Sequence, residues 1–191
     1  RVSGNAPDHI EMWFDSVNFP ADPALATPVI VTAGADTSGI DFALAPAGSI
    51  SGTVFAADGS TPQANIPVDI EGGGYGRCTE ADGSFAINGL PLGTALILHA
   101  GGVGWPECPG GTHLQEWWEE AADPGSADPI TLSLGAGQHV TARNFTLEPA
   151  GSISGTVRDA VSNAVLGGIP VDLEGGGNGV CTEPDGTYML T

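Results

Sequence analysis

The sequence predicts an all-β protein made of tandem β-sandwich repeats, on three observations. First, 30 glycines and 15 prolines among 191 residues favour turns and short strands over long helices, while 41% apolar residues suffice for a packed core. Second, short segments alternate between apolar and polar residues, which is the period of a half-buried strand. Third, the sequence PAGSISGTV occurs twice, at residues 46–54 and 149–157. Such an internal repeat indicates a repeated domain.

The two copies of this sequence are 103 residues apart, and further segments repeat at the same offset. The matching pairs are residues 66–74 with 169–177, 78–80 with 181–183, and 41–44 with 144–147. Residues 9–15 resemble 113–119 at an offset of 104, so a one-residue insertion or deletion lies between. A unit of about 103 residues is a normal size for one domain.

The repeat divides the chain into three parts. Residues 1–45 are the closing part of one repeat, residues 46–148 form a complete repeat, and residues 149–191 open another. The two partial repeats together lack a counterpart of residues 94–100, the most apolar strand candidate. We therefore expect only the middle repeat to be complete.

Alternation and turn residues predict seven short strands in the complete repeat, which suggests a sandwich. In chain order they are expected at residues 49–55, 66–71, 76–79, 84–88, 94–100, 129–134 and 140–147. In the first strand, Ile50 and Val54 lie on one face and Ser49 and Thr53 on the other, as in an antiparallel sheet with one face on the core. Gly83 marks a hairpin turn before the fourth strand, because glycine tolerates positive φ.

Three stretches resemble the carboxypeptidase regulatory-like module: GSISGTV at 48–54, IPVDI at 66–70, and CTEADGSFAINGLPLGTA at 78–95. Residues 27–34 and 38–44, with the tryptophan segment, resemble the closing half of tandem copies of that module in large secreted bacterial proteins. The resemblance implies a seven-stranded transthyretin-like, or prealbumin-like, β-sandwich. It also implies a usually non-catalytic spacer, adhesion or assembly module at the cell surface or outside the cell.

The cysteines are interpreted in the light of this resemblance. Related modules of pilins and adhesins can cross-link a lysine to an asparagine or aspartate, but this chain contains no lysine. A disulfide between Cys78 and Cys108 is the expected substitute, closing a loop of about 30 residues. Cys181 is the repeat counterpart of Cys78, and its partner is expected beyond residue 191. The alternative is three free buried thiols, although a secreted setting favours the bridge.

The charge of the chain excludes several classes of partner. Its formal net charge is −19, whereas nucleic-acid binding requires lysine and arginine to displace counterions from phosphates. The same sign argues against anionic membrane surfaces. No stretch approaches the roughly 20 apolar residues that span a bilayer, so we expect no membrane insertion.

We expect no enzymatic activity. Glu116, Glu119 and Glu120 flank a tryptophan pair and could be imagined as the acid and base of sugar hydrolysis. However, the counterparts of Glu116, Glu119 and Glu120 in the repeat are Met12, Asp15 and Ser16. Glycosidase sites are not normally built into a repeated spacer.

The tryptophans have two interpretations. Trp117 and Trp118 are adjacent, so on a strand one should face the core and the other solvent. An exposed tryptophan could stack on a sugar or anchor a neighbouring module. Because Trp13 and Phe14 repeat the pair, a structural role is favoured over protein packing, and carbohydrate binding comes third.

Calcium is the most plausible cofactor for so acidic a chain, because carboxylates on loops bind hard cations. The weak candidates are Asp69, Glu71, Glu80 and Asp82, which are near one another in sequence. No D-x-D-x-D-G loop is present, and a solvated acidic surface is the alternative. No other cofactor is expected.

These observations favour a non-catalytic structural protein: an extracellular stalk, surface layer or filament of β-sandwich repeats. Only residues 148–151 separate neighbouring repeats, and so short a link containing proline should hold them in a fixed relation. The alternative is a carbohydrate-binding or adhesion module that uses an exposed tryptophan. Residues 149–191 of one copy could also pack against residues 1–45 of the next, unless the chain is a window on a longer covalent array.

Overall fold

The computed structural model describes residues 8–15, 17–18, 23–110, 113–135, 138–174 and 179–190. The chain divides into two compact units, Arg1–Glu148 and Pro149–Thr191. The fold is all-β, as the sequence predicts. In the described residues the regular structure consists of strands and one 3-10 turn, η1 (Pro23–Leu25). Over those same residues, no helix is long and apolar enough to cross a membrane.

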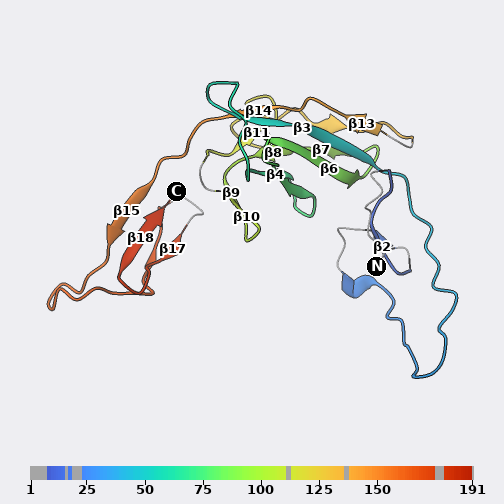
Figure 1. Cartoon of the computed structure of the whole chain (residues 1–191), viewed down its shortest axis with the longest axis horizontal. Helices are drawn as coiled ribbons and strands as arrows, with labels where there is room; N and C mark the ends of the chain where they lie inside the picture. Colours follow the sequence, from blue (N-terminus) through green and yellow to red (C-terminus); the bar gives the residue numbers. More distant parts are fainter. Residues whose placement is uncertain are drawn as a thin grey trace. The chain divides into compact units, whose positions relative to one another are not determined.

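One sheet of the first unit is centred on β3 (Gly48–Ala56), its longest strand (Figure 1). β6 (Ser84–Leu90) runs antiparallel to β3 along one edge. β13 (Gln138–Val140) and β14 (Phe145–Leu147) lie along the other edge, parallel to β3. The sequence predicted an antiparallel sheet, and this was wrong for the last two strands. They return to β3 after the chain has passed through the opposite sheet, and such a crossover permits parallel pairing.

The chain leaves the ladder briefly between β13 and β14. Ala142 there has a φ of 58°, the Arg143 N–H donates to the Ser51 carbonyl at 3.0 Å, and Asn144 Oδ1 accepts the Thr53 N–H at 2.9 Å. The bulge brings the Arg143 backbone so close to Gly52 that a Cβ on Gly52 would overlap the Arg143 carbonyl oxygen. Glycine is therefore required at this position of β3.

The opposite sheet has the order β11-β8-β4-β5 and is antiparallel throughout. Its strands are β4 (Pro67–Ile70), β5 (Gly76–Cys78), β8 (Leu98–Ala100) and β11 (Glu116–Trp117). Among the described residues, this unit also has three two-stranded ladders. They are β1 (Met12–Trp13) with β2 (Val17–Asn18), β7 (Ala95–Leu96) with β12 (Ile130–Thr131), and β9 (Val103–Trp105) with β10 (Cys108–Gly110).

All seven predicted strand regions contain strands, but two of them are divided. The apolar stretch 94–100 forms β7 and β8, which separate at Ile97 because each pairs with a different sheet partner. The region 140–147 is interrupted by the bulge before β14. The structure adds β9 and β10, which the sequence did not predict because Gly and Pro dominate residues 101–112, and the two-residue strand β11.

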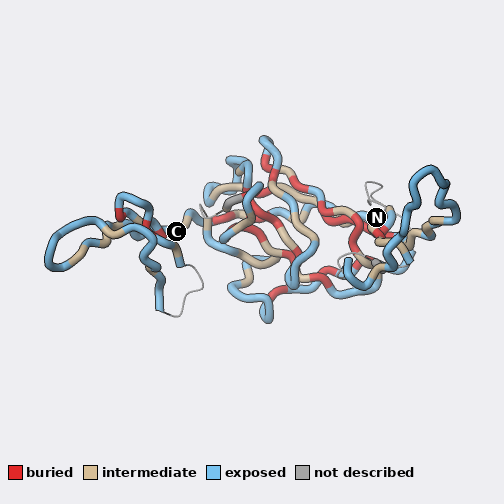
Figure 2. Tube along the Cα trace, turned by 90° about the horizontal axis from the view of Figure 1, so that it is seen from below, coloured by how far each residue is buried: buried red, intermediate tan, exposed pale blue. Residues whose placement is uncertain are grey.

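Apolar side chains from both sheets join one core. Phe85, Ile87 and Phe145 come from the β3 sheet, and Val68 and Leu98 come from the β4 sheet; each is at most 4% exposed. The arrangement is sandwich-like, as predicted. Figure 2 shows buried residues along the strands of the first unit, whereas the chain of the second unit is mostly exposed.

In the described residues of the second unit there are two ladders: β15 (Ile153–Thr156) with β18 (Thr187–Leu190), and β16 (Pro170–Val171) with β17 (Val180–Cys181). In it Thr156 is opposite Thr187, as Thr53 is opposite Ser84 in the first unit. Likewise Pro170 is opposite Cys181, as Pro67 is opposite Cys78. Each pair of positions is separated by the 103-residue offset of the sequence.

Residues 8–15 are joined to the segment before β3. The Ile10 N–H donates to the Ala45 carbonyl at 2.9 Å, and the Ala47 N–H donates to the Asp8 carbonyl at 2.8 Å. Later in the chain, the Leu114 N–H donates to the Glu148 carbonyl at 2.9 Å. By the sequence repeat this last bond is the counterpart of the first.

Candidate functional site

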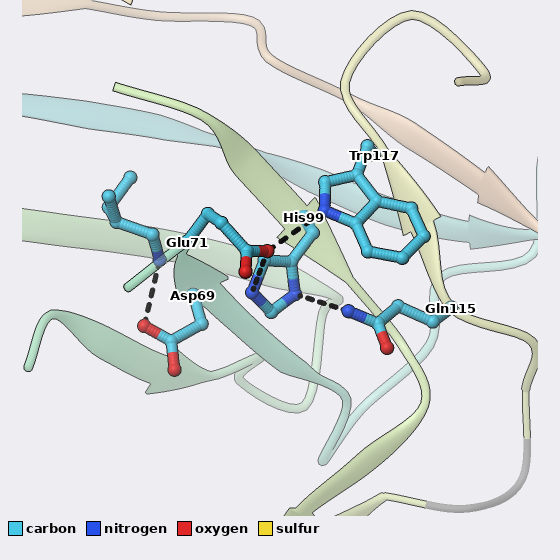
Figure 3. A network of polar contacts seen from close by, with 6 residues as sticks. Asp69, Glu71, His99, Gln115 and Trp117 are labelled. Atoms are coloured by element: carbon cyan, nitrogen blue, oxygen red, sulfur yellow. Dashed lines mark hydrogen bonds and ion pairs between the residues drawn. The ribbon is translucent and has the colours of Figure 1, made fainter. Parts of the chain in front are cut away.

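The densest polar network lies on the sheet of β4, β8 and β11 (Figure 3). Glu71 follows β4, and its Oε2 accepts the Trp117 indole N–H at 3.1 Å. His99 on β8 places Nε2 3.9 Å from the same oxygen, while its Nδ1 lies 3.3 Å from the Gln115 amide nitrogen. The His99 and Trp117 rings are 6.0 Å apart. The sheet thus joins Glu71 and Trp117, which the sequence treated separately.

Burial controls the charge of this network. It lowers the pKa of His99, against the opposing effect of Asp69 and Glu71. It also raises the pKa of Asp69, although the Ile70 N–H donates to its Oδ1 at 2.7 Å and His99 lies near. A neutral imidazole at neutral pH fits these shifts. The network orients its side chains by hydrogen bonds.

An acidic groove of about 370 Å³ lies beside β11 and contains the three glutamates that the sequence singled out. It is lined by Glu116, Trp118, Glu119, Glu120, Asn144 and Thr146. Burial, followed by the negative charges of Glu120 and Glu148, raises the pKa of Glu116 to about 7. Structural charge clusters perturb pKa values as catalytic sites do. This carboxyl can take up a proton near neutral pH.

The tryptophans depart from the expected arrangement, because Trp117 and Trp118 are both half-buried. Trp118 lies one residue past β11, where strand alternation no longer applies. Its ring meets Phe145 edge to face at 5.7 Å, and the Arg143 guanidinium lies 5.1 Å from the centre of the indole. Trp13 on β1 is half-buried too.

The predicted disulfide is confirmed. It joins Cys78 at the end of β5 to Cys108 at the start of β10, with Cα atoms 5.7 Å apart and a sequence separation of 30. Cys108 lies in a strand that the sequence did not predict. Cys181 is a free, exposed thiol. The partner that we expected for it lies outside the described residues.

The four calcium candidates do not form one cluster. Asp69 and Glu71 belong to the polar network, and Glu80 and Asp82 belong to the hairpin turn. There Asp82 Oδ1 accepts the Ser84 N–H at 3.0 Å and the Ser84 hydroxyl at 2.6 Å, which lowers the pKa of Asp82. In the part of the chain that the structure describes, no group of three or more His, Cys, Asp or Glu residues could hold a metal ion.

A serine, a histidine and an aspartate also meet, which the sequence did not predict. Ser49 Oγ lies 2.7 Å from His139 Nδ1, and His139 Nε2 lies 3.3 Å from Asp8 Oδ1. These are the residue types of a nucleophile, a base and an orienting carboxylate. However, Ser49 is only 8% exposed, so its hydroxyl is not open to a substrate. Since Ser49 and His139 are also opposite one another on parallel strands, the contact is a cross-strand pair.

Two surface grooves have corresponding linings in the two units. The first, of about 710 Å³, runs over β3 and β6, and the second, of about 520 Å³, over β15 and β18. The second is lined by Ser154, Gly155, Thr156, Val180, Cys181, Glu183, Thr187, Tyr188 and Met189. Each of these follows a residue of the first groove by the repeat offset. Among the described residues, Ala142 and Asn144 also line the first groove and have no counterpart in the lining of the second.

No protein-family model, no curated protein and no solved structure matches the chain.

Proposed function

We propose that the chain is a non-catalytic structural module of an extracellular bacterial stalk, surface layer or filament. In this proposal it consists of tandem prealbumin-like sandwich repeats of about 103 residues, related to the carboxypeptidase regulatory-like module. The observation that carries the proposal is the shared strand register of the two units. The same strand positions pair in β15–β18 as in β3–β6, and in β16–β17 as in β4–β5.

The turns support the proposal as well. Asp82 and Asp185 each accept the N–H and the hydroxyl of the residue two positions later. These hydrogen bonds lower the pKa of both carboxyls. These two aspartates thus have the same local structural use in both units, which supports a repeated scaffold.

The proposed location outside the cell is supported by the disulfide. Disulfides persist in oxidising compartments and are rare in the cytosol. The Cys78–Cys108 bond ties β5 to the β9–β10 hairpin. A small sandwich exposed to proteases and dilution gains from such a covalent tie.

A non-catalytic role is supported by the poor access of the groups that resemble catalytic ones. Ser49 is buried, and the polar network uses Glu71 to hold the Trp117 indole. Both rings of the Trp117–Trp118 pair are half-buried, which leaves less of a flat platform for a sugar ring.

Electron microscopy of the protein at increasing concentration tests the proposal. We expect elongated polymers with a repeat set by one sandwich domain. Dispersed particles at every concentration, also in the native material, would overturn the assembly role. Isothermal titration against a glycan panel tests the alternative function. Heat of binding that is lost in W117A would favour a carbohydrate-binding module.

A further inference from the structure

Residues 8–15 are hydrogen-bonded to the start of the complete repeat. The sequence repeat assigns this segment to the preceding repeat, which ends at residue 45. The Ile10 N–H donates to the Ala45 carbonyl at 2.9 Å, and the Ala47 N–H donates to the Asp8 carbonyl at 2.8 Å. Ala47 is buried. The segment thus lies against the residues that lead directly into β3.

The complete repeat forms the same link within itself. There the Leu114 N–H donates to the Glu148 carbonyl at 2.9 Å, at the positions that correspond to Ile10 and Ala45. The complete repeat has both of its sheets, so this bond is a property of the repeat. We therefore take the place of residues 8–15 beside the start of β3 as the regular end of a repeat.

An ion-pair contact joins this segment to β13 of the complete repeat. His139 Nε2 on β13 lies 3.3 Å from Asp8 Oδ1. This carboxylate oxygen is shielded from solvent and has no other hydrogen-bond donor among the residues that the structure describes. A shielded negative charge is costly unless a donor faces it. The imidazole of His139 is the group that faces Asp8.

Ser49 on β3 orients this imidazole. Ser49 Oγ lies 2.7 Å from His139 Nδ1, and the two residues are opposite one another on parallel strands. Ser49 is buried, so its hydroxyl needs a partner within the protein. A neutral imidazole that accepts this hydroxyl at Nδ1 carries its proton on Nε2, directed at Asp8. A protonated imidazole presents an N–H to Asp8 as well, so the contact is available in both forms.

Two further residues of the segment lie close to the complete repeat. The His9 carbonyl oxygen is 3.6 Å from the position that a Cβ would occupy on Gly89, near the end of β6. The negative charge of Glu11 acts on Tyr75, whose pKa is raised first by burial and then by this charge. Tyr75 itself packs against the core. The segment therefore meets the complete repeat beside β5 and β6 as well as on β13.

We propose that residues 8–11 dock the preceding repeat on the complete repeat, with the contact between Asp8 and His139 as the latch. The receiving surface is formed by the start of β3, the end of β6 and β13, and its occupant is the neighbouring repeat of the same chain. The short link limits the distance between two repeats, and the docked segment adds a contact that fixes their orientation. The inference rests on the proposed function, because it takes residues 1–45 as the end of a preceding repeat.

Amide hydrogen exchange of the full chain, followed residue by residue by NMR, tests the latch. The reporters are the amides of Ile10 and Ala47, whose hydrogen bonds hold the segment in place. In D8A and in H139A both amides should exchange about tenfold faster or more, the factor that corresponds to the loss of a hydrogen bond to a charged group. D36A removes an exposed carboxylate elsewhere in the same partial repeat and is the matched control. It should exchange like the wild type.

The double variant D8A/H139A distinguishes a direct contact from two independent effects. If the two residues act through each other, the double variant should exchange no faster than either single variant. If their effects multiply, they do not act as a pair and the latch is overturned. The Val54 amide donates to the Gly83 carbonyl inside the complete repeat and reports that the sandwich is intact. If its exchange rises in H139A, D8A alone decides, because Asp8 lies outside the two sheets.

The outcomes also separate this inference from the proposed function. Ile10 and Ala47 amides that exchange at the wild-type rate in D8A overturn the docking. If electron microscopy still shows polymers in that case, the structural role stands and the junction between repeats is held in another way. If the docking is confirmed but only dispersed particles are seen, the contact between repeats stands and the assembly role fails.

Discussion

The hydroxyl of Thr79 accepts the Ile66 N–H at 2.9 Å and donates to the Gln63 carbonyl at 2.6 Å. Thr79 is 3% exposed, so the hydroxyl satisfies two backbone groups away from water. Thr182 in the second unit repeats both bonds, to Ile169 at 3.0 Å and to Leu166 at 2.7 Å. In the first unit these bonds join the end of β5 to the residues before β4. In the second unit they join the end of β17 to the residues before β16.

Substitution of this threonine should be costly. T79V keeps the shape of the side chain but leaves the Ile66 N–H with no hydroxyl acceptor. We expect a loss of about 1–3 kcal/mol of unfolding free energy, the cost of an unsatisfied buried donor, measured by urea denaturation. T131V, at an exposed strand position, should change stability little. Equal stabilities of T79V and T131V would contradict the role assigned to the hydroxyl.

Removal of the disulfide should destabilise the first unit. C78S/C108S releases a loop of 30 residues, and we expect a loss of about 3 kcal/mol from the unfolded-chain entropy that the bridge removes. C181S, which changes an exposed free thiol, is the matched control and should melt like the wild type. The same loss of unfolding free energy should appear when the disulfide of the wild type is chemically reduced. If neither change lowers the unfolding free energy, the disulfide does not stabilise the first unit.

Gly52 should tolerate no side chain. In G52A the Cβ would overlap the Arg143 carbonyl oxygen, and the resulting overpacking should cost about 1–3 kcal/mol or more. At Gly151 a Cβ has no neighbour within 4 Å. G151A should therefore melt close to the wild type. If G52A is as stable as G151A, the backbone of the bulge is not held against β3.

Glu116 should make stability depend on pH. Its pKa is raised from an ordinary 4.5 to about 7 by burial and by Glu120 and Glu148. Between these values the folded protein holds a proton that the unfolded chain has lost, so this group makes stability fall as pH rises through the window. Above about pH 7 its contribution is constant.

The variant E116Q isolates this effect. It should flatten the decline between pH 5 and about 7 and be more stable than the wild type at pH 8, as followed by urea denaturation at each pH. E107Q, at an exposed position, should keep the slope of the wild type. A slope in E116Q identical to that of the wild type would assign the decline to other groups.

Local sequence patterns were sufficient to predict the strands in which buried and exposed residues alternate. Val68 and Ile70 on β4 and Phe85 and Ile87 on β6 are buried as alternation requires. The pairing of β13 and β14 with β3 joins residues about 90 positions apart, and no local pattern encodes it. The β9–β10 hairpin lacks the pattern because Gly and Pro dominate its sequence, and the Cys78–Cys108 bond joins it to β5.

Less of the candidate site could be predicted from the sequence. The repeat indicated a structural role for the tryptophans, but strand alternation failed at Trp118 because it lies past the end of β11. The contact of Glu71 with Trp117 depends on the order of β4, β8 and β11 in the sheet. Thr79 was placed in a strand, and only the tertiary structure brings the Gln63 carbonyl to its hydroxyl.

The parallel pairing of β3 with β14 has a mechanical consequence. A pulling force that enters the sheet at Gly48 and leaves it at Leu147 draws these two strands past each other in opposite directions. The hydrogen bonds between Val54–Ala56 and Phe145–Leu147 are then loaded together, in shear. An antiparallel arrangement of the same two strands would open one bond at a time, like a zipper. Pulled in this way, the bonds between the two strands must break together rather than one after another.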